Sequence, residues 1–452
     1  MTDIVACERV HPLPDGELRL LGAHDCVTGA MTRIELGKSA VLVDCGVPQG
    51  RDAHDFVFPE AARDTAAAVL THGHNDHVGS LPALLEGGYE GPIFGTAATL
   101  AVTRLSLEDA LEMQRASTAE VRAFLTRFDA LSRPFPYDVL REALPGISLA
   151  FREAGHILGS ASVEVRSARS SALVSGDLGR PGAPILRDPN TTWDMSRPFD
   201  VVVVETTYGS REHAHGHDDV LGAFEAILLD AVARKSRVLV PSFAIGRTQT
   251  LLYYLNELVE SGRVPAFPVA LDTPMGLAVT DTYKRFSRLF DKESVEKMAH
   301  GDDDVLDWKT LFPIKHGRDS RRLADLPGPL LVIAGSGMCT GGRIVRHLVD
   351  GLPDPSTTVL FVGHQAEGTP GRRIQDAAKS GRGVRLDGEE VKVRARIATL
   401  KGLSAHADRK ELLGWLSHLP TPRRLALHHG DREAQEAFAT YLGEQKFGQR
   451  PG

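Results

Sequence analysis

The sequence is poor in cysteine, lacks long apolar runs and has no excess of basic residues. Its 452 residues include four cysteines, Cys7, Cys26, Cys45 and Cys339, at spacings that suggest no pairing. This favours a reducing compartment over a disulfide framework. No apolar run approaches the length of a membrane span, and the first residues do not have the apolar core of a signal peptide. We therefore expect a soluble, cytoplasmic protein with no membrane contact.

Charge and length set further bounds. The formal net charge is -7, with 42% hydrophobic and 25% charged residues. These proportions are ordinary for a globular protein. A negative net charge means that the protein as a whole does not attract nucleic acid electrostatically. A polyanionic substrate would therefore need local basic patches or metal ions. A chain of 452 residues is too long for one ordinary core, so two or three compact units are expected.

The most informative stretch is a histidine cluster at 72–77. An apolar run at 66–70 predicts a buried strand before it, and the stretch at 78–85 predicts a short helix after it. The cluster therefore occupies a strand-to-helix loop, where side chains can converge without competing for core space. It offers three imidazoles and one carboxylate, the donors that zinc selects, from His72, His74, Asp76 and His77. We interpret it as a metal site.

Acidic residues follow further apolar strands. Asp44, Asp177 and Glu205 each come at or just after a short apolar run that predicts a buried strand. An acid at a strand end is often only a turn-forming cap, and that interpretation stays open for Asp44. Beside a zinc cluster, Asp44 fits better as a carboxylate that fixes a metal ligand or its loop. Asp177 could supply the anionic bridge that two metals share.

Other histidines could complete such a site. His156 lies in a glycine-rich turn that allows close backbone approach. His406 lies between strands expected at 391–396 and 424–427, and His428 and His429 follow the second of these. A surface position stays open for each of the last two. The first cluster already supplies more donors than one tetrahedral zinc can use, so a second metal would need further ligands.

The middle of the chain has a different pattern of predicted helices and strands. Residues 97–130 show a helical pattern, and beyond residue 201 strands and helices alternate, which predicts a parallel sheet flanked by helices. Two Gly/Ser-rich loops in this region each open a helix and could present N–H groups to phosphate, although tight strand–helix turns use the same residues. The candidate substrate contacts in these loops are Arg247, Ser336, Thr340 and Arg343.

Taken together, these motifs resemble a known family. Four positions are similar to the N-terminal motifs of the metallo-β-lactamase fold: Asp44, the 72–77 cluster, His156 and Asp177. Three more are similar to the additional motifs of the β-CASP subgroup, which processes nucleic acids: Glu205, His406 and His429. The resemblance is closest to prokaryotic relatives of the cleavage and polyadenylation specificity factor nuclease. It implies an α/β fold, an αββα sandwich formed by residues 1–200 and 387–452, with a β-CASP cap domain inserted at 201–386.

The resemblance also implies a two-zinc site. One zinc would be held by His72, His74 and His156, and the other by Asp76, His77 and His429, with Asp177 bridging. A hydroxide between the two ions would attack the phosphodiester and leave 3′-hydroxyl and 5′-phosphate products. His406 matches the general acid and Glu205 would orient it, so the implied catalytic set is Asp76, Asp177, Glu205 and His406. We favour His429 over His428 as the last ligand because it directly precedes Gly430 and Asp431, as in the family pattern.

The leading hypothesis is a zinc-dependent RNA endonuclease that acts in RNA processing or decay. In the family, a histidine at the last motif goes with RNA substrates, so His429 favours RNA over DNA. The alternatives are another hydrolase on the same fold, such as a DNA nuclease or a thioesterase, and a non-catalytic RNA-binding subunit. Whether exonuclease activity accompanies cleavage, and whether the protein forms a homodimer, stays open.

Overall fold

The computed structural model describes residues 2–53, 56–214, 216–300 and 304–448. The chain packs as two compact units. The first unit combines residues 1–212 with residues 405–452, and the second unit is formed by residues 213–404. The second unit is therefore an insertion in the sequence of the first.

The first unit contains two seven-stranded sheets. One sheet has the order β2 (Val10–Leu13), β3 (Gly16–Gly22), β4 (Met31–Leu36), β5 (Ser39–Val43), β6 (Ala67–Val69), β7 (Ile93–Gly95) and β8 (Ser132–Pro134). The other has the order β1 (Asp3–Val5), β22 (Arg424–His428), β13 (Val201–Glu205), β12 (Ser171–Val174), β11 (Ala161–Arg166), β10 (Ile147–Glu153) and β9 (Arg141–Leu144). Strands from both ends of the chain thus share one sheet.

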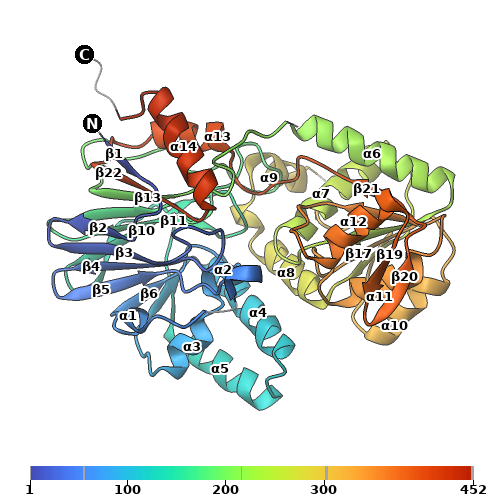
Figure 1. The fold of residues 1–452 in the computed structure, drawn as a ribbon, viewed down its shortest axis with the longest axis horizontal. Helices are drawn as coiled ribbons and strands as arrows, with labels where there is room; N and C mark the ends of the chain where they lie inside the picture. The colour runs from blue at the N-terminus through green and yellow to red at the C-terminus, as the bar shows by residue number, and fades with distance from the viewer. Residues whose placement is uncertain (1, 54–55, 215, 301–303, 449–452) are drawn as a thin grey trace. The chain divides into compact units, whose positions relative to one another are not determined.

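Three apolar layers hold these sheets and their helices together. Buried side chains from both sheets form one core between them, among them Ile34, Val41, Phe151 and Val203. The outer face of the first sheet packs against its own helices: α1 (Glu60–Arg63), α2 (Asn75–Val78), α3 (Leu81–Glu86), α4 (Ala97–Met113) and α5 (Thr118–Leu131). The outer face of the second sheet packs against α13 (Arg409–Ser417) and α14 (Arg432–Glu444). Figure 1 shows these layers, and they form the expected αββα sandwich.

Strand pairing in the second sheet brings distant motifs together. β13 lies parallel to β12 on one side and to β22 on the other. The register places Glu205 opposite His428. Because the carboxyl ends of parallel strands meet at one sheet edge, the residues that follow β12, β13 and β22 gather there.

The second unit is built on a six-stranded parallel sheet. Its order is β16 (Leu311–Pro313), β15 (Val269–Asp272), β17 (Leu330–Ala334), β14 (Arg237–Pro241), β18 (Thr358–Phe361) and β21 (Arg396–Thr399). The helices of this unit are α6 (His217–Ala233), α7 (Arg247–Glu260), α8 (Pro274–Arg285), α9 (Lys292–Ala299), α10 (Gly317–Arg322), α11 (Arg343–Gly351) and α12 (Pro370–Ser380). A hairpin of β19 (Gly383–Leu386) and β20 (Glu389–Lys392) packs with α11 and α12 into one core. The alternation expected from the sequence is thus a parallel α/β sheet.

The structure differs from the sequence-based expectations in three details. The helical pattern at 97–130 forms two helices, because Arg115 adopts a left-handed φ of 65° and Ser117 starts α5 with a capping box to Glu120. The strand expected at 391–396 is divided between β20 and β21. The cap domain was expected at 201–386, but the second unit comprises residues 213–404. β13 pairs within the first unit, and β21 pairs within the second.

Within the described ranges, no helix combines the length and the apolar character needed to cross a bilayer.

Candidate metal centre

The expected ligands lie at the carboxyl ends of strands in the first unit. His72 and His74 follow β6, and His74 is the residue before α2, which carries Asp76 and His77. His156 follows β10, Asp177 follows β12 and His429 follows β22. The expected strand-to-helix loop holds His72 and His74, whereas Asp76 and His77 lie in the short helix α2 and not in the loop.

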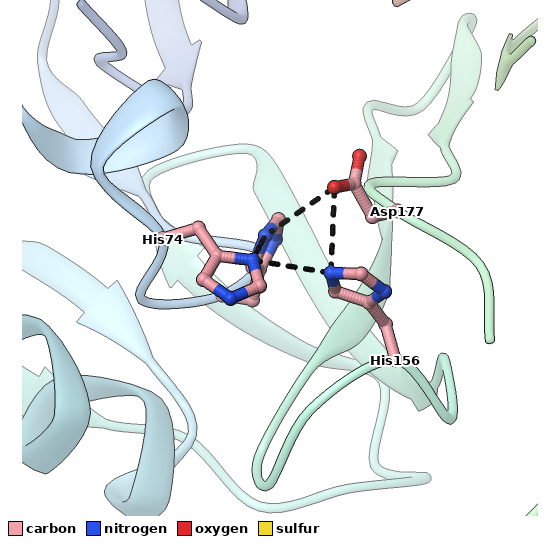
Figure 2. Close-up of side chains that lie close together, drawn as sticks. His74, His156 and Asp177 are labelled. Carbon is pink, nitrogen blue, oxygen red and sulfur yellow. Dashed lines mark hydrogen bonds and ion pairs between the residues drawn. The ribbon is translucent and has the colours of Figure 1, made fainter. Parts of the chain in front are cut away.

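A first group of donors consists of three imidazoles and one carboxylate. Nε2 of His72 and Nε2 of His156 each lie 3.1 Å from Nδ1 of His74. Oδ2 of Asp177 lies 3.5 Å from each of the same two Nε2 atoms. Figure 2 shows His74, His156 and Asp177 pointing toward a common centre. One donor atom from each of the four residues lies within 4.8 Å of the others.

A second group lies on the other side of Asp177. Nε2 of His77 is 3.1 Å from Nε2 of His429, which is 3.6 Å from Oδ2 of Asp76. Oδ1 of Asp177 lies 3.2 Å from Nε2 of His77 and 3.5 Å from Nδ1 of His429. The two oxygens of Asp177 therefore face different donor groups, as a bridging carboxylate would.

Protonation suits a cation in the first group, and in the second group a metal would displace a proton from His77. Burial would lower the pKa of His77, but Asp177 and Asp44 outweigh it and raise that pKa well above its usual value. Burial holds the pKa of His72 and of His156 well below the usual range, so both rings are neutral and carry a lone pair. Burial alone would raise the pKa of Asp177, but His429 and His77 outweigh it and hold that pKa well below its usual value. Neutral imidazoles and ionised carboxylates are the ligands of zinc, so this donor set fits the metal.

Asp44 and Thr71 support the ligands from outside. Asp44 accepts hydrogen bonds from the backbone N–H and the hydroxyl of Thr71, both at 2.8 Å. Its Oδ2 also lies 2.8 Å from Nδ1 of His77, and the Thr71 hydroxyl lies 3.1 Å from Nδ1 of His72. Bonds to the outer nitrogens fix the ring orientation and turn Nε2 toward the centre.

Thr71 and a second threonine, Thr207, support histidine rings but were not among the sequence candidates. Thr71 directly precedes His72, which was an available signal. Thr207 has its hydroxyl 3.1 Å from Nδ1 of His429, and it was signalled only by its place two residues after Glu205. The carbonyl oxygen of Ala405 fills the same role for His156, at 3.1 Å from Nδ1.

His428 and His429 have different surroundings. Nε2 of His428 lies 2.9 Å from the carbonyl oxygen of Gly22, away from the donor groups. Burial, followed by the neighbouring His429, lowers the pKa of His428 to about 3. His429 adopts a left-handed φ of 50° and faces Asp76, His77 and Asp177.

Glu205 and His406 form a pair beside the first donor group. Oε1 of Glu205 lies 3.1 Å from Nδ1 of His406, and the His406 and His156 ring centroids are 4.6 Å apart. Burial lowers the pKa of His406, but the Glu205 carboxylate and then Asp177 outweigh it and raise that pKa to about 9. The side chain of His406 is 22% exposed, so a ring that holds its proton also reaches solvent.

The candidate substrate residues lie in the second unit. The hydroxyl of Ser336 accepts hydrogen bonds from the N–H groups of Thr340 and Gly341, at 3.0 and 3.3 Å. Nη1 of Arg343 donates to Asp272 at 2.6 Å and to a backbone carbonyl at 2.9 Å. Nη2 of Arg343 donates to a second carbonyl at 2.9 Å. Arg343 thus anchors its own unit. Arg247 is the first residue of α7.

Comparison with protein families gives three matches along the chain. Residues 24–242 match the metallo-beta-lactamase superfamily. Residues 248–374 match the Beta-Casp domain, and residues 390–450 match the Zn-dependent metallo-hydrolase RNA specificity domain.

Similar proteins agree with these matches. The chain is 37% identical to a protein named ribonuclease TTHA0252 from Thermus thermophilus, over 93% of this chain and 94% of that protein. It is 31% identical to transcription termination factor FttA of Cenarchaeum symbiosum, over 89% of this chain. The match covers 64% of that archaeal protein, so the chain spans less than two thirds of its length. A crystal structure of a protein of unknown function from Enterococcus faecalis V583 has a similar fold, with a TM-score of 0.56, 11% identity and coverage of 92% and 95% of the two chains.

Proposed function

Because this chain belongs to the metallo-β-lactamase superfamily, in the group that carries the β-CASP and RNA specificity domains, we propose that it is a zinc-dependent ribonuclease. It would cut RNA internally by hydrolysing phosphodiester bonds, in RNA processing or decay. The observation that carries the proposal is the position of Asp177, whose two oxygens face two separate groups of buried donors.

The donor groups suit two zinc ions. One ion would be held by His72, His74 and His156, the other by Asp76, His77 and His429, with Asp177 shared. Zinc at these positions would supply positive charge for the scissile phosphate and would acidify the attacking water. Asp44, Thr71 and Thr207 would keep the histidine rings oriented, through the hydrogen bonds to their outer nitrogens.

His406 is suited to protonate the departing oxygen. Glu205 would accept a hydrogen bond from Nδ1–H of His406 and so orient the ring, and Nε2–H would be the acid toward the substrate. As water adds to phosphorus, the bond from phosphorus to O3′ breaks and the proton of His406 passes to O3′. The products would carry a 3′-hydroxyl and a 5′-phosphate. The raised pKa of His406 supports this role, because the ring holds its proton at neutral pH.

RNA is favoured over the other substrates of this fold for two reasons. Residues 390–450 match an RNA specificity domain, and the relative that is 37% identical is named a ribonuclease. His429 also stands at the motif where, by resemblance, RNA-directed members keep a histidine.

The experiment compares an internally labelled RNA with a DNA of the same sequence. Purified protein is assayed as isolated, after removal of metal by a chelator, and after zinc is restored. We expect RNA fragments with 3′-hydroxyl ends, loss of cleavage on chelation and recovery with zinc at two ions per chain. Equal cleavage with and without chelator would contradict metal dependence. Preferred cleavage of DNA, or hydrolysis of a thioester without RNA cleavage, would favour another hydrolase. RNA binding without cleavage by the zinc-loaded protein would indicate a binding subunit.

A further inference from the structure

The central strands of the second unit end in three neighbouring loops. β14 lies between β17 and β18, so the chain crosses over β14 when it passes from β17 through α11 to β18. Ligands of open parallel sheets bind outside the carboxyl ends of the strands, at the place where the strand order reverses. The loops after β14, β17 and β18 meet at this place.

Phe243, in the loop after β14, is unusually placed for a large apolar side chain. It is 42% exposed, whereas most phenylalanines of the described residues are buried or half-buried. Part of its ring lies against the backbone of the loop after β17. A Cβ atom added to Gly337 would stand 2.6 Å from Cδ2 of Phe243, and one added to Gly363 would stand 3.8 Å from Cε2. Gly337 therefore makes room for the ring, and Gly363 lies within van der Waals range of it.

Hydrogen bonds from two buried side chains hold the backbone of Phe243 and of the two glycines beside its ring. The carbonyl oxygen of Phe243 accepts from the N–H and the hydroxyl of Thr248, at 3.2 and 2.7 Å. Nε2 of the buried Gln365 donates to the carbonyl oxygens of Gly337 and Gly363, at 2.9 and 3.4 Å. Thr248 and Gln365 are buried. The backbone under the ring is thus fixed, although the ring itself reaches solvent.

We propose that Phe243 is a stacking platform for a base of the RNA substrate. The inference rests on the proposed function, because it takes RNA as the ligand. An aromatic ring that is backed by backbone on one side and open to solvent on the other offers its remaining surface to a flat partner. Single-stranded nucleic acids are held in this way, since every base has a π-face, and the contact is tolerant of sequence. The backbone on which the ring rests is held before the base arrives, so little backbone entropy is lost on binding.

Phe312 provides a matched control. It is 49% exposed and also belongs to the second unit, but it lies in β16, the edge strand of the sheet. Phe312→Ala therefore removes a similar fraction of exposed aromatic surface from an edge strand that β15 and β17 separate from β14.

The test measures binding of a single-stranded RNA by fluorescence anisotropy, in the full chain carrying His406→Ala so that cleavage is slow during the measurement. Phe243→Ala should weaken binding about fivefold to a hundredfold. Phe243→Trp should keep or tighten binding, and Phe312→Ala should leave it unchanged. Gly337→Ala should weaken binding as Phe243→Ala does, because its Cβ displaces the ring. The slope of log affinity against log salt should stay the same in Phe243→Ala, since no phosphate contact is lost.

A second readout reports stacking directly. The fluorescence of RNA with single 2-aminopurine substitutions should be quenched at one position on binding, and Phe243→Ala should restore it there. Equal affinity of Phe243→Ala and wild type, or an equal loss in Phe312→Ala, would overturn the proposal while leaving ribonuclease activity intact. Conversely, Phe243-dependent RNA binding by a protein that never cleaves RNA would refute the proposed function and keep the stacking role. Absence of RNA binding by the wild-type chain would refute both.

Discussion

Oε1 of Glu205 lies 3.1 Å from Nδ1 of His406, although 201 residues separate them in the chain. The same oxygen accepts a hydrogen bond from the N–H of Leu178 at 2.8 Å, and Oε2 accepts one from the N–H of Thr207 at 3.2 Å. The carboxylate is therefore held by backbone groups independently of His406. One member of the pair is thus held in place without help from the other.

The first prediction concerns the proposed general acid. His406→Ala should lower the single-turnover rate of RNA cleavage by about two to four orders of magnitude, because general acid catalysis contributes on that scale. Zinc content should stay at the wild-type value, since His406 is not one of the proposed ligands. Rates are measured at saturating RNA, and zinc is measured by elemental analysis of the same preparation.

Glu205→Gln is the conservative companion to this variant. Its amide keeps the shape and one acceptor oxygen but loses the charge, so the rate should fall roughly tenfold and less than in His406→Ala. An unchanged rate in His406→Ala would remove this residue from the mechanism and favour a different hydrolase chemistry. Loss of zinc from His406→Ala would instead identify the residue as a ligand.

The second prediction separates two adjacent histidines. His429→Ala should lower the zinc content from two ions per chain to one, because its ring faces Asp76 and His77. His428→Ala should keep both ions and lose about 1 kcal/mol of stability, because it loses a buried hydrogen bond to the carbonyl oxygen of Gly22. Elemental analysis and thermal unfolding distinguish the two. The reverse pattern would make His428 the ligand.

The donor-rich cluster was predictable because its chemistry is local. Three histidines and an aspartate within six positions at a strand end have few structural roles other than metal binding. The choice between His428 and His429 depends on non-local geometry. β22 ends at His428, which the sheet register sets opposite Glu205, and His429 leaves the strand with a left-handed φ of 50° and faces Asp76 and Asp177.

Local signals were sometimes present and missed. The break in the 97–130 helical pattern coincides with Ser117 and Glu120, a spacing typical of a helix start. Other features had no local signal. Arg343 follows a Gly/Ser loop that suggests phosphate binding, and its actual partner, Asp272, lies 71 residues away. The sequence pattern cannot show whether a guanidinium will bind a phosphate or a carboxylate from another strand.

The third prediction tests the hydroxyl of Thr71. Thr71→Val keeps the shape of the side chain but removes the bonds to Asp44 and His72, so zinc affinity should fall about tenfold to a hundredfold. Thr71→Ser retains the hydroxyl and should retain wild-type affinity. Affinity is measured by competition with a chromogenic chelator, and circular dichroism checks that both variants fold. Equal affinity in the Val and Ser variants would show that the hydroxyl does not support the metal.

The fourth prediction concerns a buried charge in the second unit. Asp272 is buried and accepts hydrogen bonds from Arg343 and Ser320, and its other near contact is His347 at 2.7 Å. Burial alone would raise its pKa, but these partners outweigh it and lower that pKa. Asp272→Asn should therefore cost about 3 kcal/mol of unfolding free energy at neutral pH, because the cation of Arg343 loses its counter-charge.

The pH dependence of this cost has a definite sign. A carboxylate with a lowered pKa stabilises the fold above its unfolded value of about 4, and the stabilisation is lost as pH falls through the lowered value. The difference between wild type and Asp272→Asn should thus shrink as the pH falls below about 4. Guanidinium unfolding can be followed by Trp308, which lies in the second unit, after the tryptophans of the first unit are replaced by phenylalanine. A difference that stays constant down to pH 3 would show that the ionised form of Asp272 does not stabilise this unit.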